Sequence, residues 1–125
     1  RFNIRNNPNS PAAQIRALIE DLLQQHDCGD YEMDWDVSGE PFVTAGGALP
    51  GAVDAALETV LGSRPVHDTG GGTSDGRFFA AAGSQVVELG VVNASIHRIN
   101  EHVRSADLDV LHMLYYDIIR RLLAA

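Results

Sequence analysis

A run of glycines among small polar residues is the first feature of this sequence that suggests chemistry. It covers Thr69-Gly-Gly-Gly-Thr-Ser-Asp-Gly-Arg77, and a helix-like segment follows from Phe78. Glycines leave backbone N–H groups bare, and a glycine turn that enters a helix N-terminus is a ready site for a carboxylate or phosphate. The spacing matches neither a Walker loop nor the dinucleotide G-x-G-x-x-G pattern. The run is therefore either an anion site or a tight turn without a ligand.

His97 is the second candidate, as a metal ligand. It lies near Asn93, and Glu101 follows four residues later, so a helix would place His97 and Glu101 on one face. The sequence contains no H-E-x-x-H or H-x-E pattern, and a catalytic zinc normally takes three protein ligands. We expect any metal site within this chain to be incomplete, and a structural or exposed histidine is the alternative.

Charged residues near the N-terminus offer two weaker candidates. Arg5 lies on the polar face of an alternating segment, where a guanidinium could clamp a carboxylate or simply face solvent. Glu32, Asp34 and Asp36 alternate with apolar residues and would share one face of a strand. Three carboxylates on one face could hold a metal, but a solvated sheet face is the favoured interpretation.

Composition excludes several classes of function. All nine basic residues are arginine, which removes Schiff-base chemistry, a P-loop lysine and a pyridoxal-phosphate anchor. The net charge of −8 argues against a nucleic-acid partner. The single cysteine, Cys28, can form neither an intramolecular disulfide nor a cysteine zinc cage. No apolar run approaches the ~18–20 residues of a membrane span, and no signal peptide is visible.

The elements that carry these residues begin with a β-α-β pattern over residues 1–41. Residues 2–5 alternate between apolar and polar types, as a strand does. Ser10 is expected to be the N-cap of a helix, whose apolar stripe recurs at i, i+3, i+4, i+7 and i+8 over residues 15–23. Residues 31–37 alternate again and give the clearest predicted strand.

A second unit is expected over residues 42–125, after a Ser-Gly-Glu-Pro break. A helical stripe over residues 53–61 ends at Gly62, a typical C-terminal signal. Residues 85–89 form a short apolar run typical of a strand buried on both faces. Ser105 is expected to cap a final amphipathic helix with Asp107 in its first turn.

Several segments together resemble a known family. They are Thr69-Gly-Gly-Gly-Thr-Ser-Asp-Gly-Arg-Phe78, Val86-Val-Glu-Leu-Gly90, Asn93-Ala-Ser-Ile-His97 and Ile99-Asn-Glu101, with Phe2-Asn-Ile-Arg5 and Ser38-Gly-Glu-Pro-Phe42 also similar. The sequence resembles the C-terminal end of the bacterial succinyl-diaminopimelate desuccinylases, which are di-zinc amidohydrolases of the M20 type. It departs from them at Val91, where the family usually has proline.

The resemblance implies an α/β fold in two parts. Residues 1–41 would be the last β-α-β of a ferredoxin-like lid and dimerisation domain, and residues 42–125 the C-terminal part of a zinc-aminopeptidase-like catalytic domain. Full-length members hydrolyse N-succinyl-LL-2,6-diaminopimelate to succinate and LL-2,6-diaminopimelate in lysine and cell-wall precursor synthesis. The resemblance further implies a cytoplasmic homodimer with two zinc ions per subunit, for which cobalt could substitute.

The same resemblance assigns roles to individual residues. His97 matches a histidine that ligates one zinc. The residues that match substrate contacts are Arg5, Ser38, Gly72, Thr73 and Asn93. The general base and the other zinc ligands belong to earlier parts of the full-length enzymes, so no catalytic residue is assigned. We therefore expect this chain to be a fragment that is inactive alone.

Other functions remain open at this point. A related acyl-amino-acid deacylase of the acetylornithine deacetylase type would share the fold. A non-catalytic dimerisation or interaction module could use the exposed edge of the predicted N-terminal sheet. A small-anion or nucleotide binder at the glycine run is disfavoured by the lack of lysine and by the acidic composition.

Overall fold

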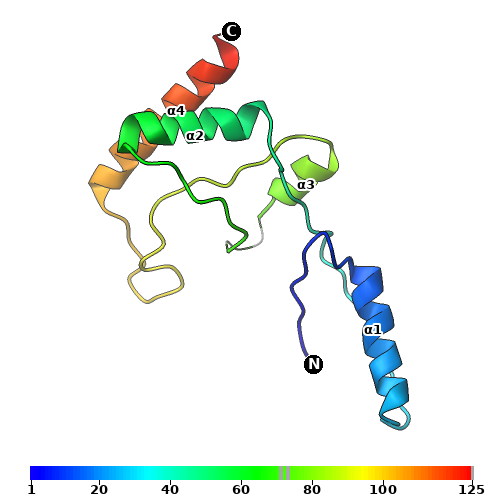
Figure 1. Ribbon diagram of the computed structural model, residues 1–125. Helices are drawn as coiled ribbons and strands as arrows, with labels where there is room; N and C mark the ends of the chain where they lie inside the picture. Colours follow the sequence, from blue (N-terminus) through cyan, green and yellow to red (C-terminus); the bar gives the residue numbers. More distant parts are fainter. Residues whose placement is uncertain (71, 73, 125) are drawn as a thin grey trace. The chain divides into compact units, whose positions relative to one another are not determined.

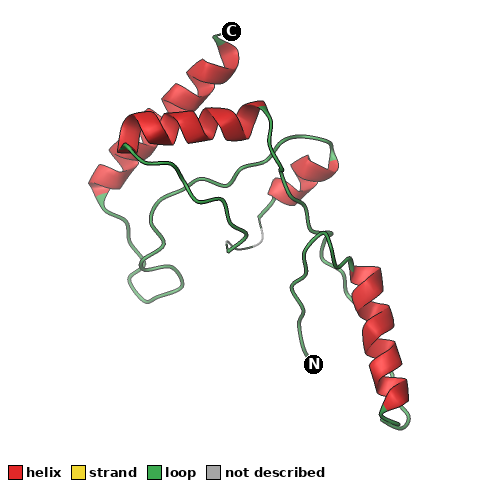
Figure 2. Cartoon of the chain, viewed as in Figure 1, coloured by secondary structure: helices red, strands yellow, loops and turns green. Residues whose placement is uncertain are grey.

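The computed structural model describes residues 1–70, 72 and 74–124. These residues form the helices α1 (Ala12–Gln25), α2 (Ala48–Leu61), α3 (Gly76–Ala81) and α4 (Ser105–Leu123), and no strand occurs among them (Figures 1 and 2). The chain divides into two compact units, Arg1–Val43 and Thr44–Ala125. Within the described ranges, no helix is long and apolar enough to cross a membrane.

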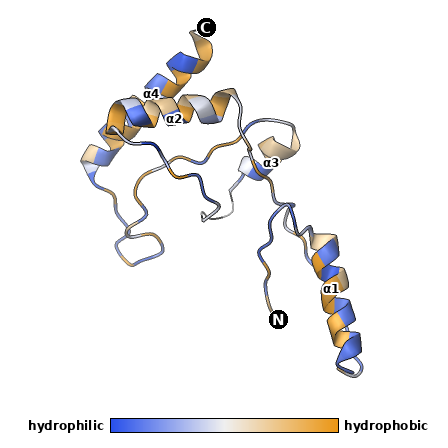
Figure 3. Cartoon of the chain, in the orientation of Figure 1, coloured by the Kyte–Doolittle hydropathy of each residue, from blue (hydrophilic) through white to orange (hydrophobic). Residues whose placement is uncertain are grey.

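The first unit is built around α1, and its predicted cap is wrong by one residue. Pro11, with an extended ψ of 156°, is the N-cap, and no side chain caps the helix. Ser10 instead closes the preceding turn, where its N–H donates to the Asn7 carbonyl at 2.9 Å. The apolar stripe is present, as Figure 3 shows by the alternation of apolar and polar residues around α1. No residue of α1 is buried, and Leu18 and Leu22 stay 57% and 43% exposed.

The strands predicted at residues 2–5 and 31–37 are not formed. Both segments lack the ladder of backbone hydrogen bonds that defines a strand. Met33 and Trp35 are half-buried while Tyr31 and Val37 are exposed, so the expected apolar face is only partly covered. A strand is stable only where a neighbouring strand pairs with its N–H and C=O groups. The predicted β-α-β of residues 1–41 therefore keeps only its helix here.

The second unit has its core between α2 and α4, which pack side by side (Figure 1). The buried apolar residues are Ala52, Val53, Ala56 and Leu57 of α2 with Leu114 and Ile118 of α4. Ala56 is 0% exposed, and this small side chain lets the two helices approach closely. The apolar stripes predicted for both helices thus face each other.

The sequence predicts one end of these helices correctly, the C-terminus of α2, but not the residue that caps the N-terminus of α4. Gly62 is the C-cap of α2 in the left-handed conformation, with φ 72°, and its N–H donates to the Glu58 carbonyl at 3.0 Å. That prediction is confirmed. Ser105 is not the cap of α4, because it is already helical and the extended Arg104 holds that position. Asp107 lies in the first turn as expected, and it accepts hydrogen bonds from Arg104 at 2.6 and 3.1 Å.

The predicted strand at residues 85–89 is an extended segment without a partner strand among the described residues. Val87 and Leu89 pack on the α2–α4 core. The Val86 N–H donates to Thr44 Oγ1 at 3.1 Å, and the Leu89 carbonyl accepts from the Tyr115 hydroxyl at 2.7 Å. Side chains thus replace part of the missing ladder, which explains how the segment stays in place without a sheet.

Gln85 caps α2 across a gap of 36 residues in sequence, and Gly47 makes this possible. Gln85 Oε1 accepts a hydrogen bond from the Leu49 N–H at 2.9 Å, which satisfies a free donor of the first helical turn. Gly47 has φ +123°, and a Cβ built on it would lie 1.8 Å from Gln85 Nε2. Only glycine combines this backbone conformation with the close approach of the glutamine.

We expect Gly47→Ala to lower the free energy of unfolding of the second unit by roughly 1–3 kcal/mol, because alanine is strained at this φ and displaces the capping amide. Urea denaturation would measure the change. Gly51→Ala is the matched control, because Gly51 lies inside α2 with open space around its Cβ position. Equal stability of Gly47→Ala and the parent would show that the cap and the strain do not matter.

A buried carboxylate joins the end of α4 to α2. Asp117 is 8% exposed and accepts hydrogen bonds from Arg121 Nε at 2.7 Å and from Arg120 Nη2 at 3.1 Å. Arg121 Nη2 donates to Thr59 Oγ1 of α2 at 3.0 Å. The hydrogen bonds from Arg121 and Arg120 lower the pKa of Asp117 below its ordinary value of 3.8, against the opposing effect of burial.

This pKa shift predicts how stability depends on pH. Because the folded pKa of Asp117 is depressed, its contribution is complete above pH 3.8 and is lost as the pH falls through the lower, folded value. We expect Asp117→Asn to lower the melting temperature at pH 7 and the difference from the parent to shrink below pH 3.8. Asp109→Asn, at an exposed acid of the same helix, is the control. A pH-independent difference would contradict this explanation.

Candidate functional site

The loop between Gly90 and α4 carries two predicted site residues, Asn93 and His97. Both have exposed side chains. The Asn93 carbonyl accepts the Ile96 N–H at 3.3 Å, so a turn starts at Asn93. His97 has φ 60°, in the left-handed region that residues with a Cβ seldom adopt. The helix considered for this segment is not formed, so the spacing from His97 to Glu101 does not place them on one helical face.

Ser95 closes this loop at its neck. Its Oγ donates to the His102 carbonyl at 2.6 Å and accepts from the His102 N–H at 3.0 Å. Figure 1 shows the chain looping back on itself in the golden-yellow segment before α4. The exposed imidazole of His97 therefore projects from a closed loop.

The glycine run is described only in part, because Gly71 and Thr73 lie outside the described residues. Gly72 is exposed, with open space around it. The Gly70 N–H, one of the donors considered for an anion, donates to Asp68 Oδ1 at 2.9 Å. The substrate contacts assigned to Gly72 and Thr73 therefore stay predictions.

Ser74 anchors the far end of the glycine run. Its hydroxyl forms a hydrogen bond with the Glu88 carboxylate and accepts the Gly76 N–H at 3.1 Å. A Cβ on Gly76 would lie 2.8 Å from Val86 Cγ1, so glycine is needed where α3 begins. The run is therefore joined to the extended segment that leads into the loop of His97.

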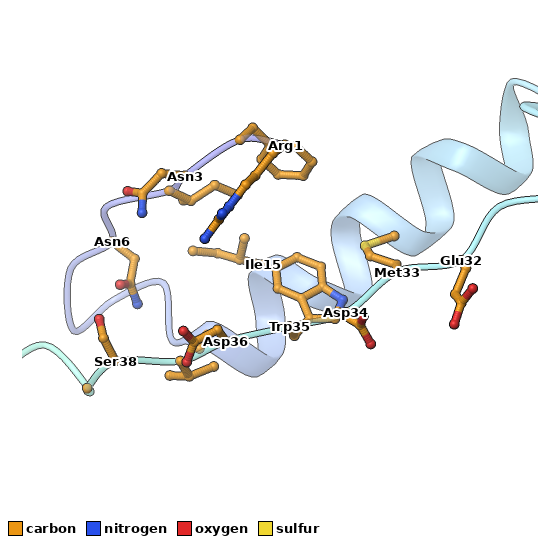
Figure 4. Close-up of a pocket in the computed structure, with 15 residues that line it drawn as sticks. Arg1, Asn3, Asn6, Ile15, Glu32, Met33, Asp34, Trp35, Asp36 and Ser38 are labelled. Carbon is orange, nitrogen blue, oxygen red and sulfur yellow. The ribbon is translucent and has the colours of Figure 1, made fainter.

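The first unit contains two of the predicted substrate contacts, Arg5 and Ser38, and only Ser38 borders a hollow in the surface. Ser38 lines an open hollow of about 1020 Å³ together with Asn3, Asn6 and Trp35 (Figure 4). Arg5 is exposed and is not among the residues that line this hollow. Arg5 and Ser38, the two predicted substrate contacts of this unit, therefore do not share this hollow.

The acidic residues of the first unit border the same hollow. Glu32, Asp34 and Asp36 follow one another along the extended segment in Figure 4. Across the described ranges, no group of three or more His, Cys, Asp or Glu residues is placed to hold a metal ion. All three acids are exposed, as expected for a solvated face, but the sheet on which that face was predicted is not formed.

The structure pairs two polar residues, His67 and Asp54, that the sequence offers no reason to connect. His67 Nε2 lies 2.6 Å from Asp54 Oδ1, and both border a smaller hollow beside Gly46 and Gly47. The two residues are 13 apart in sequence, and no motif links them. Only the packing of the segment after α2 against that helix brings them together.

Comparison with known proteins identifies the family. The model of Peptidase family M20/M25/M40 matches residues 3–121, nearly the whole chain. The chain belongs to this family. Membership supports an α/β, zinc-peptidase-like domain, although the described residues here form helices and unpaired extended segments.

Curated members of the M20 family resemble this chain closely. It is 51% identical over 122 residues to a succinyl-diaminopimelate desuccinylase of Alkalilimnicola ehrlichii, and 49% identical over 122 residues to one of Thioalkalivibrio sulfidiphilus. It is 49% identical over 123 residues to one of Xylella fastidiosa. Each alignment covers 98% of this chain and 32% of the relative. The chain thus spans about a third of the length of the curated relatives it matches.

M20 desuccinylases are metal-dependent and generally use zinc. The described residues do not fit a complete zinc site, because His97 stands without other candidate ligands gathered around it. A single exposed imidazole can supply one ligand, whereas a zinc centre needs three or four. The remaining ligands would have to come from outside the described part of this chain.

Proposed function

We propose that this chain forms part of a zinc-dependent amidohydrolase that converts N-succinyl-LL-2,6-diaminopimelate to succinate and LL-2,6-diaminopimelate. The observation that carries the proposal is 45–51% identity over 98% of the chain to several relatives that all have this activity in their name. Residues 1–41 would belong to the lid and dimerisation domain, and residues 42–125 to the catalytic domain, in a cytoplasmic homodimer.

Within this proposal the chain supplies substrate contacts and one metal ligand. The substrate carries several carboxylates, which a guanidinium and bare backbone N–H groups bind well. Arg5 and the glycine run at Gly72 and Thr73 suit that role, and Ser38 and Asn93 offer further polar contacts. His97 would ligate one of two zinc ions, which cobalt could replace. The chain alone would be inactive.

Substrate competition tests the proposal. We expect the full-length protein that contains this chain to hydrolyse succinyl-diaminopimelate with a far higher kcat/KM than acetylornithine, because the free carboxylate of the succinyl group, which an acetyl group lacks, would bind the guanidinium and N–H donors proposed here. The reverse preference would favour an acetylornithine deacetylase. Hydrolysis by the 125-residue chain with zinc, lost in His97→Ala, would overturn the view that its site is incomplete.

A dimerisation module is a second candidate, favoured by the uncovered stripe of α1. No residue of this helix is buried, and Leu18 and Leu22 are exposed. An apolar stripe of this kind is covered in most stable proteins. Sedimentation of the chain would separate the candidates, because a monomer at high concentration argues against a module whose function is association.

A further inference from the structure

Ser95 is a buried polar residue in a loop that is otherwise largely exposed. It is 9% exposed, whereas all other residues from 92 to 104 have exposed side chains. Its hydroxyl bonds with both backbone groups of His102, at 2.6 Å to the carbonyl and 3.0 Å to the N–H. The Ser95 hydroxyl thus acts as both donor and acceptor, and it links Ser95 to the backbone of His102, seven residues later.

The loop enclosed by this contact is conformationally demanding. His97 and Asn100 both have left-handed backbones, with φ 60° and 62°. Such residues persist only where the surrounding structure holds them. The Arg98 N–H donates to the Ser95 carbonyl at 3.1 Å, and His102 Nδ1 donates to the Asn100 carbonyl at 2.7 Å. Ser95 therefore makes hydrogen bonds to Arg98, directly after His97, and to His102, where the loop ends.

We propose that Ser95 is a positioning residue, whose hydroxyl closes the loop and so fixes the backbone from which His97 projects. The assignment to catalysis rests on the proposed function, whereas the closure of the loop does not. Ser95 touches neither substrate nor metal in this proposal. It acts through the left-handed conformation of His97, which sets the direction of the imidazole.

Amide hydrogen exchange tests the closure in the 125-residue chain. We expect Ser95→Ala to speed exchange of the His102 amide about tenfold, because this N–H loses its acceptor and the neck opens. Ser95→Thr keeps the hydroxyl and should restore slow exchange. Ser63→Ala, at an exposed serine after α2, is the control. Unchanged exchange in Ser95→Ala would overturn the proposal.

Kinetics test the positioning role in the full-length desuccinylase that contains this chain. We expect Ser95→Ala to lower kcat roughly 10- to 100-fold with little change in KM, as for other residues that orient a ligand, and Ser95→Thr to recover most of the activity. Faster exchange with an unchanged kcat would overturn the positioning role. Full activity in His97→Asn would overturn the proposed function and with it the catalytic role of Ser95. The exchange data would still report separately whether the loop is closed.

Discussion

On the proposed function, replacing His97 with asparagine should lower the kcat/KM for succinyl-diaminopimelate roughly 1,000-fold or more, because loss of a ligand to a catalytic metal costs several kcal/mol and each 1.36 kcal/mol is tenfold in rate. The prediction applies to the full-length protein that contains this chain. Steady-state kinetics with saturating zinc would measure it. Metal content of the purified variant, determined in parallel, should fall as well.

Asparagine is the informative substitution because of the backbone at this position. His97 is left-handed, with φ 60°, and asparagine tolerates that region better than alanine does. His97→Asn therefore removes the imidazole while keeping the turn. A loss shared by His97→Ala and His97→Asn belongs to the side chain, and an extra loss in the alanine variant belongs to the loop.

His112→Ala is the matched control for this prediction. His112 is an exposed histidine on α4, outside the loop that carries His97. It should keep the parent kcat/KM and metal content. If His97→Asn also retained both, His97 would not be a zinc ligand, and the roles assigned to its neighbours through the same resemblance would lose their main support.

The helices could be predicted from the sequence because their signals are local. The apolar stripes of α2 and α4 recur at helical spacing, and Gly62 marks the end of α2 by its freedom to adopt a left-handed conformation. Ser105 was misleading, because a serine at a helix start is a good cap only when the backbone there is extended. Arg104 takes that conformation instead.

The predicted strands at residues 2–5, 31–37 and 85–89 failed for a different reason. Alternation or a short apolar run shows which faces a segment can cover, but a strand also needs a partner that local pattern does not supply. Val86 and Leu89 show the consequence, because side chains of Thr44 and Tyr115 take the place of a neighbouring strand.

The residues of the candidate site also differ in whether a local sequence signal points to them. His97 and Asn93 are candidates because a histidine and an asparagine at this spacing match a known family, and their roles stay predictions. Ser95 gave no signal, because nothing in a sequence distinguishes a serine that closes a loop from one that faces solvent. His67 and Asp54 are likewise joined only by folding.

The largest effect on stability is expected for Ile118→Ala. Ile118 is 5% exposed and lies in the core formed by α2 and α4. Truncation removes buried methylene groups and leaves a cavity, which should lower the free energy of unfolding by about 2–5 kcal/mol. The core cluster found among the described residues has six buried members, and the expected loss is a large fraction of the stability of a typical small domain.

The neighbouring residue provides a control with the same chemistry. Ile119 is 54% exposed, so Ile119→Ala removes the same atoms from a surface that water already reaches, and its effect should stay within about 0.5 kcal/mol. Urea denaturation of both variants, followed by circular dichroism, would give the comparison. Equal destabilisation by the two variants would contradict the difference in burial on which the prediction rests. In that case the stripe around Ile119 would be covered as well, and the face of α4 that is exposed here would carry a packing partner.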